Sequence, residues 1–273
     1  MSSLLGVEPA FVDRGIITSA GADAVVALYL RYIGEEASGK VAIANTTGDM
    51  SFTHGDVGSE AADTTVNPDG GVAGTIDLSG EAATFQALAE LVNASANWEL
   101  IPVGYLPTDA TEASGTAKIV NNVSATQAKT ATGMAVYFDR SASLHHSIGI
   151  TANGPSSEPH GFDAGMRNII NLLSVTLTYS SGTHLVKVYE VDDIEGTATE
   201  LASFSAAATT VALTRPTSGT PGTLWQSEGK RLVVKQVSTT AEPSAWTYEI
   251  HWERYQTGPG IRKSKMWAYG PCT

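Results

Sequence analysis

The stretch LLSVTLTYSSGTHLVKVYEV, residues 172–191, contains two runs of apolar and β-branched residues separated by a polar turn. Such residues favour strands, and a short run bounded by Ser, Gly and Thr is typical of one strand of a sheet. Four more runs of this kind follow, at residues 200–206, 209–214, 231–238 and 246–255. Strands at this spacing, joined by short polar turns, predict an antiparallel β-sandwich.

The run HLVKVYEV, residues 184–191, does not reveal which of its faces is buried. Alternation along a strand puts one set of side chains on one face, namely Leu185, Lys187, Tyr189 and Val191. The other face then carries Val186, Val188 and Glu190. Each face contains a charged residue, so both registers stay open.

The first half of the chain predicts an α+β arrangement that is mostly strands. Strands are expected at residues 23–34, 40–45, 50–55, 97–106, 133–139 and 144–152. In the first of these, Val26, Leu28 and Leu30 alternate with other residues, the period of a half-buried strand. Residues 56–71 are acidic and rich in Gly, Asp and Thr, and we expect a long exposed loop there.

One helix is predicted between these strands. Ser79 is a suitable N-cap, and Glu81 would then lie in the first turn. Apolar residues follow at positions i, i+3, i+4 and i+7, namely Phe85, Leu88, Ala89 and Val92. We expect this stripe to pack on a sheet.

The chain is expected to divide into three parts. Residues 153–161, NGPSSEPHG, combine two prolines with two glycines and two serines, which is typical of a linker. The predicted parts are an α+β docking domain at 1–153, a β-sandwich at 154–257 and an extended C-terminal arm at 258–273. The fold class is therefore mainly β.

The charge is strongly asymmetric. The net charge is −12, and residues 1–150 hold 17 acids and 6 bases (6 − 17 = −11). Residues 151–273 hold 11 acids and 10 bases (10 − 11 = −1). The first half would repel nucleic-acid phosphates, so we expect no nucleic-acid partner. The amino terminus has no basic region and no long apolar run, so we expect synthesis in the cytoplasm without a signal peptide and no membrane partner.

No motif predicts a catalytic or cofactor site. His145 and His146 are adjacent and would point to opposite faces of a strand, so they cannot chelate one ion together. Asp192, Asp193 and Glu195 precede Gly196 and offer oxygens of the kind that Ca²⁺ takes. Their spacing is not that of an EF-hand, and ordinary turn chemistry is the favoured interpretation. We expect no cofactor, no metal and no enzymatic activity.

Tryptophans leave a carbohydrate-binding alternative open. Stacking on a sugar could use any of five residues: Trp98, Trp225, Trp246, Trp252 or Trp267. Trp246 and Trp252 are six positions apart on one predicted strand, hence on one face. Core packing is the favoured use of that pair. A third alternative is a hydrolase whose carboxylates come from distant positions.

The end of the chain combines cations with aromatic residues and glycines. The residues expected to mediate interaction are Arg254, Arg262, Lys263, Lys265, Trp267 and Tyr269. Aromatic and arginine side chains are the usual anchors of interfaces, and cations complement acidic surface. We therefore expect an arm that docks on a neighbouring subunit.

The stretch GTIDLSGEAATFQALAELVNASANWELIPVGYLPT, residues 74–108, resembles segments of structural proteins of tailed bacteriophages. In those, a strand leads to a short helix ending LxxLVN and then to a strand bearing Trp. The resemblance implies a repeated building block of the virion and carries over no functional residue. No long helix of the kind expected of a major capsid protein is predicted, so a capsid decoration or cement protein is favoured over a tail component. The implied partners are other copies of the chain and other virion proteins.

Overall fold

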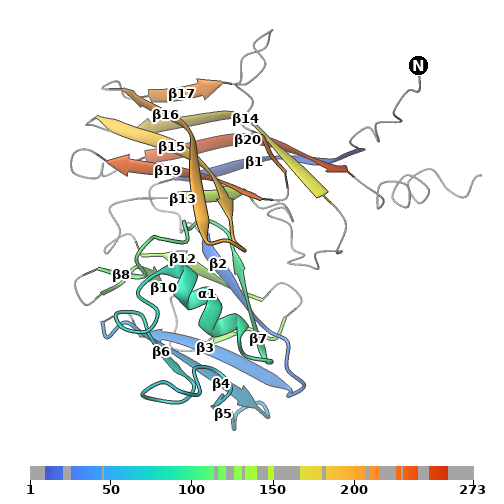
Figure 1. The fold of residues 1–273 in the computed structure, drawn as a ribbon, viewed down its shortest axis with the longest axis vertical. Helices are drawn as coiled ribbons and strands as arrows, with labels where there is room; N and C mark the ends of the chain where they lie inside the picture. Colours follow the sequence, from blue (N-terminus) through green and yellow to red (C-terminus); the bar gives the residue numbers. More distant parts are fainter. Residues whose placement is uncertain are drawn as a thin grey trace, which may run out of the picture.

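The computed structural model describes most of the chain, and the statements below concern that part. The described residues are 10–20, 26–44, 46–113, 116–120, 126–130, 133–139, 147–150, 167–179, 183–206, 210–214, 226–228, 230–238 and 246–257. Figure 1 shows two groups of elements, with strands β1 and β13–β20 above strands β2–β12 and the helix α1. No helix among the described residues combines the length and the apolar character needed to cross a membrane.

The upper group is a sandwich of two antiparallel sheets, which confirms the prediction of a mainly β fold. The first sheet has the order β1 (Ala10–Ala20), β20 (Trp246–Thr257), β14 (Arg167–Tyr179) and β17 (Thr210–Thr214), and β18 (Gln226–Glu228) also pairs with β14. The second has the order β13 (Ser147–Ile150), β19 (Arg231–Ser238), β15 (His184–Asp192) and β16 (Thr197–Ala206). The six strands predicted in this half correspond to β14, β15, β16, β17, β19 and β20.

Strand β15 resolves the register that the sequence left open. Val186 and Val188 are fully buried, so their face lies on the core, whereas Lys187 is partly exposed. Val191 lies on the opposite face, as alternation requires, and is buried there because it packs with Leu106 and Val233. Across from the Val188–Tyr189 step, β16 contains an extra residue, Leu201, which has no partner in the β15 ladder. Such a bulge increases the local twist of β16, whereas the pairing of β15 with β19 continues without interruption to Val191.

The lower group is built on two further antiparallel sheets. One has the order β10 (Ile119–Val120), β12 (Met134–Phe138), β2 (Val26–Tyr32) and β7 (Trp98–Pro102). The other has the order β11 (Thr126–Gln127), β3 (Ser38–Ala44), β4 (Asp49–Gly55) and β5 (Ala61–Ala62), with β6 (Thr75–Asp77) also on β4. The strands β8 (Glu112–Ala113) and β9 (Thr116–Ala117) form a separate pair. The strands predicted in the first half are therefore present as β2, β3, β4, β7, β12 and β13.

The helix α1 (Phe85–Asn93) lies where it was predicted, but its start differs. The N-cap is Thr84, whose Oγ1 accepts a hydrogen bond from the backbone N–H of Ala87 at 3.3 Å. Ser79 is not the N-cap, because its N–H and hydroxyl both donate to Asp77 Oδ1 at 2.7 Å in a separate turn. Glu81 consequently precedes the helix.

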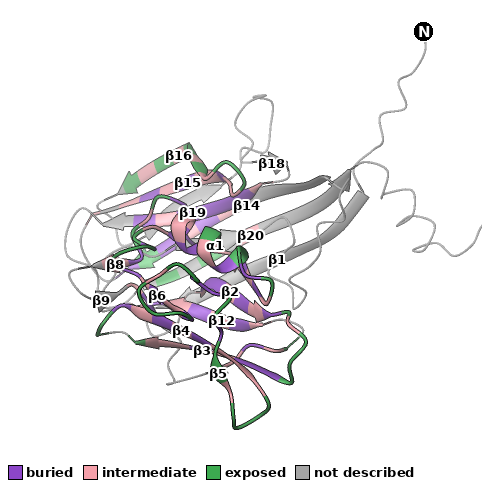
Figure 2. Cartoon of the chain, turned by 60° about the horizontal axis from the view of Figure 1, so that its bottom comes forward, coloured by how far each residue is buried: buried purple, intermediate pink, exposed green. Residues whose placement is uncertain are grey.

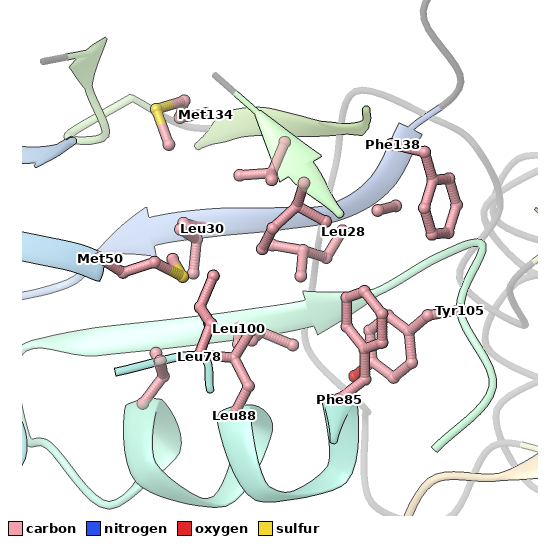
Figure 3. Close-up of a cluster of buried hydrophobic side chains, with 14 of the residues drawn as sticks. Leu28, Leu30, Met50, Leu78, Phe85, Leu88, Leu100, Tyr105, Met134 and Phe138 are labelled. Carbon is pink, nitrogen blue, oxygen red and sulfur yellow. The ribbon is translucent and has the colours of Figure 1, made fainter. Parts of the chain in front are cut away.

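Figure 3 shows how the helix completes the core of the lower group. Phe85 and Leu88 point from α1 towards Leu28 and Leu30 on β2, with Leu100 of β7 between them. All five are buried, as is Val92 one turn further along the helix. The predicted packing of the apolar stripe on a sheet is therefore confirmed. This buried cluster is continuous with that of the sandwich, which it reaches through Val175, Leu177, Val186, Val188, Leu232 and Val234.

Two further expectations concern the loop at 56–71 and the domain division at 153/154. The segment 56–71 was expected to be an exposed loop, but Asp63 and Val66 within it are fully buried and Asn67 nearly so. The expectation was wrong for these residues because the segment folds back over β4 and β7 through hydrogen bonds of Asp63. The domain division at 153/154 stays a prediction, and β1 and β13, which precede it, pair with β20 and β19, which follow it.

Candidate functional site

A buried arginine joins the two groups of strands. Arg231 begins β19, and its side chain is only 4% exposed. Its Nη1 donates to the carbonyl oxygens of Val103 and Tyr105, at 2.6 and 3.0 Å, in the segment that follows β7. Its Nε and Nη2 donate to the two carboxylate oxygens of Asp193, at 2.7 and 2.6 Å. Bidentate charged pairs of this geometry are among the stronger hydrogen bonds in proteins. Arg231 therefore ties the β15–β16 turn to the lower group.

Aromatic packing surrounds this arginine. The guanidinium carbon lies 4.9 Å from the ring centre of Tyr105, close enough for a cation–π interaction. The Tyr105 ring also stacks on the ring of Phe85 from α1, with the two ring centroids 4.5 Å apart. Burial raises the pKa of Tyr105 above its ordinary value of 10.0, so the phenol stays neutral. The helix, the 103–105 segment and β19 thus share one contact.

A second charged pair and a small apolar cluster extend the junction. Lys235, four residues further along β19, pairs with Asp109 of the lower group. Beside them, Leu106 packs with Val191 and Val233 in a buried cluster separate from the main core. We call the contacts around Arg231, Tyr105, Leu106 and Lys235 the junction. Its groups come from both halves of the sequence, so it fixes the two groups of strands against each other.

A buried carboxylate organises the lower group in the same way. Asp63 is fully buried, and its two oxygens accept four hydrogen bonds. Oδ1 accepts from the N–H and the hydroxyl of Thr65, at 3.0 and 2.7 Å. Oδ2 accepts from Asn97 Nδ2 at 3.0 Å and from Trp98 Nε1 at 2.9 Å. Burial alone would raise the pKa of Asp63, but these hydrogen bonds outweigh it and hold the pKa below the ordinary value of 3.8.

A histidine and a tyrosine lie at the rim of this carboxylate. His54 Nε2 is 3.8 Å from Asp63 Oδ1, and His54 Nδ1 is 3.2 Å from Tyr32 Oη. Burial raises the pKa of Tyr32 above its ordinary value. An acid, an imidazole and hydroxyls in one place are the components of proton transfer. Here, however, the four donors already engage the acceptor positions of the carboxylate, which suits fastening of the loop better than removal of a proton.

The aspartates of the acidic turn at 192–195 accept hydrogen bonds from neighbouring groups of the protein. Asp193 is held by Arg231, and Asp192 Oδ1 accepts the backbone N–H groups of Ile194 and Glu195, at 3.0 and 3.1 Å. Gly196 closes the turn with a positive φ of 65°. This is the turn chemistry favoured from the sequence. Across the described residues, no three His, Cys, Asp or Glu side chains come together as metal ligands would.

The predicted interaction residues are only partly placed. Arg254 lies inside β20, where its backbone is opposite Asp13 of β1 and Ile170 of β14, so it belongs to the sheet and not to an arm. The other five lie outside the described residues, namely Arg262, Lys263, Lys265, Trp267 and Tyr269.

The tryptophans considered for sugar stacking have different positions. Trp98 is buried against Tyr32 and Phe52, with ring centroids 5.1 Å away in each case, so the prediction that it could stack on a sugar was wrong. Trp246 and Trp252 lie on β20 as predicted. Trp225 and Trp267 lie outside the described residues.

The sandwich also presents strand edges. β16 and β17 end the two sheets on one side, and β1 and β13 end them on the other. Along β16, the side chains of Thr199, Leu201, Ser203 and Ser205 are exposed, and Figure 2 shows this strand at the border of the molecule. The most exposed large apolar side chain of the described residues is Ile194, at the β15–β16 turn. Backbone groups along such an edge are templates for pairing with another chain.

The sequence patterns did not identify Arg231 and Asp63, the two buried charged residues that hold the junction and the 56–71 segment together. Arg231 did carry a signal, since it is the charged residue that directly precedes the apolar run LVV. A charged residue at such a position needs a partner when it is buried. Asp63 carried no distinguishing signal, because it is one of several acids in a segment rich in Asp, Gly and Thr.

A surface ion pair gives the lower group a defined response to acid. Lys40 Nζ lies 2.7 Å from Glu60 Oε1. Hydrogen bonds from Lys40 and Ser38 hold the pKa of Glu60 at about 2, below the ordinary value of 4.5. A depressed pKa means that this pair stabilises the fold above pH 4.5 and loses its effect as the pH falls towards 2.

We expect Glu60→Gln to be less stable than the natural protein at pH 7, with the difference vanishing near pH 2. The measurement is the urea midpoint at steps between pH 7 and 2. Glu36→Gln, which changes an exposed glutamate of the same group, controls for the lower net charge. A Glu60→Gln difference that stays constant across this range would contradict the assignment.

Comparison with known proteins adds little. No known protein family and no curated protein matches the chain. Among solved structures, that of infectious bursal disease virus, Gt strain, is 11% identical with a TM-score of 0.18, covering 92% of this chain and 76% of that one. A crystal structure of the T13 particle of the same virus is 11% identical with a TM-score of 0.12, covering 97% and 82%. Likenesses of this size do not establish a shared fold.

Proposed function

We propose that the protein is a non-enzymatic structural protein of a virion, which assembles in many copies and decorates or cements a capsid. The observation that carries the proposal is the junction, in which a buried arginine fastens a sandwich, whose edges pair with no further strand among the described residues, to a second, acidic group of strands. A repeated building block needs such a fixed relation between its parts. The resemblance of residues 74–108 to structural proteins of tailed phages supports the same conclusion.

Charge gives the proposed assembly a direction. Residues 1–150 have a net charge of −11 (6 − 17), whereas the segment 258–273 contains Arg262, Lys263 and Lys265 and no acid. A cationic segment with Trp267 and Tyr269 as anchors is complementary to the acidic half of another copy or of another virion protein. We propose that this segment acts as the arm that links copies.

Deleting residues 258–273 is therefore expected to weaken self-association while the fold stays intact. The segment follows β20, the last strand of the described residues, and itself lies outside them. Sedimentation velocity over a concentration series measures the association. The thermal unfolding midpoint should change by no more than a degree or two, because no described core residue is removed.

Two variants separate the contributions within the arm. Replacing Arg262, Lys263 and Lys265 with glutamine removes the charge and keeps much of the side-chain length, and replacing Trp267 and Tyr269 with alanine removes the aromatic anchors and keeps the charge. The charge variant should also abolish the dependence of association on salt. Association that is unchanged by the full deletion would remove the arm from the proposal.

A further inference from the structure

We infer that β16 is a homodimer interface, along which two copies pair their β16 strands antiparallel across a two-fold axis. The inference rests on the proposed self-assembly and identifies one of its contacts. Such pairing would join two four-stranded sheets, each with the order β13, β19, β15 and β16, into one continuous sheet. A two-fold interface uses the same surface on both partners, so the edge must be compatible with itself.

The other described edges carry features that discourage pairing, and β16 has few of them. β1 has a register irregularity after Phe11, followed by the charged pair Asp13 and Arg14. β7 ends in Pro102, which has no N–H to donate. β13 and β17 are only 4 and 5 residues long. β16 has 10 residues, and proteins commonly protect edges of this length with charge.

The only charge on β16 is already neutralised within the molecule. Glu200 Oε2 lies 2.8 Å from Lys187 Nζ on the neighbouring strand β15. The remaining residues of β16 are Thr, Ala, Leu, Ser and Phe. Like charges opposite each other on paired strands are destabilising, and two copies of this edge would bring together no uncompensated pair.

The bulge indicates where along β16 the axis would lie. Leu201 is unpaired in the β15 ladder and is 38% exposed, so the regular part of the edge is residues 202–206. An axis at Ser203 would place Ala202 opposite Phe204, Leu201 opposite Ser205 and Glu200 opposite Ala206. The side chains of Ala202 and Phe204 pack against the core of the sandwich, which holds this part of β16 in place. A partner strand would also cover Leu201.

Lysine at the axis tests the inference directly. In Ser203→Lys, two cations would meet across the axis, and we expect the dimer dissociation constant to rise at least about tenfold. Val72→Lys is the matched control, since it adds the same charge at an exposed position of the lower group. Sedimentation velocity of both variants, of the natural chain and of the chain lacking 258–273 gives the comparison.

The outcomes separate this contact from the proposed function. A dimer that survives deletion of 258–273 and Val72→Lys but is lost in Ser203→Lys supports the β16 interface. Association that Ser203→Lys leaves intact and the deletion abolishes overturns the interface while the arm proposal stands. A natural chain that is monomeric at every concentration overturns the interface, and the arm proposal then needs another virion protein as its partner.

Cysteine cross-linking provides an independent measurement that needs no change of charge. In a Cys272→Ser background, which has no other thiol, single cysteines are placed at residues 199, 201, 203 and 205. Only a residue near the axis lies opposite its own copy, so disulfide-linked dimer should peak at 203 and fall at 199. Equal yields at all positions, or none, would overturn the inference.

Discussion

Arg231→Met is expected to destabilise the protein by about 2–4 kcal/mol, because it leaves buried acceptors without donors. Methionine retains most of the apolar stem, so packing in β19 is largely conserved. The carbonyl oxygens of Val103 and Tyr105 lose the hydrogen bonds at 2.6 and 3.0 Å that Nη1 supplies. Asp193 loses both bonds from the guanidinium but is 33% exposed and can be partly solvated.

The neighbouring residue provides a matched control. Lys230 lies 3.3 Å from Glu190 and 3.7 Å from Asp192, but its side chain is 39% exposed. Exposed ion pairs contribute roughly 0–1 kcal/mol, so Lys230→Met should change the stability little. Urea denaturation of both variants measures the difference. If Arg231→Met is no more destabilising than Lys230→Met, Arg231 does not fasten the junction.

The same experiment reports whether the two groups of strands unfold together. Their continuous core and the junction lead us to expect one cooperative transition in the natural protein. Loss of the Arg231 contacts removes a link between β19 and the 103–105 segment. In Arg231→Met we therefore expect the transition to broaden or to separate into two steps, detected by near-UV and far-UV circular dichroism.

Local patterns in the sequence predicted the elements of this fold well. Val186 and Val188 form strand β15 because β-branched residues suit a pleated, half-buried surface, and the same is true of the Val-rich run in β19. The stripe of Phe85, Leu88 and Val92 predicted α1 because its spacing puts these side chains on one helical face. Such signals depend on residues that are close in the chain.

Local patterns could not determine which capping residue begins the helix. Ser79 and Thr84 are both suited to an N-cap, and the choice between them depends on Asp77, whose carboxylate engages Ser79 first. They also could not show that β14 and β15, which follow each other in the chain, belong to different sheets. The apolar and β-branched pattern of a strand is the same whichever sheet the strand joins.

The candidate site was missed because its contacts span long stretches of chain. Arg231 bonds to a carbonyl 126 residues away, and Trp98 donates to an aspartate 35 residues away. No periodicity links residues at such separations. Acids in a Gly-rich segment also have the same appearance in sequence whether they are exposed, as Asp56 is, or buried, as Asp63 is.

Asp63→Ala is expected to destabilise the lower group strongly, by about 3–5 kcal/mol, because hydrogen bonds to a charged group contribute about 1.5–3 kcal/mol each and the Trp98 donor remains buried. Trp98 Nε1 and Asn97 Nδ2 lose the acceptor Oδ2, and Thr65 loses the acceptor Oδ1. Trp98 is 1% exposed, so water cannot readily replace the carboxylate at its ring nitrogen. Asp56→Ala, which removes an exposed acid of the same segment, should change the stability by less than about 0.5 kcal/mol.

Two further measurements identify the cause of the loss. Asp63→Asn keeps the shape of the side chain but turns an amide N–H₂ group towards one pair of donors, so it should also destabilise the fold. If Asp63→Ala does not fold, Asp63→Asn replaces it in the stability measurement. The pKa of Asp63 lies below 3.8 in the folded state, so its stabilising effect is complete above that pH and is lost as the pH falls through the folded-state pKa. The difference between Asp63→Asn and the natural protein should therefore shrink in strong acid. A difference that is independent of pH would mean that packing, and not the buried charge, holds the 56–71 segment in place.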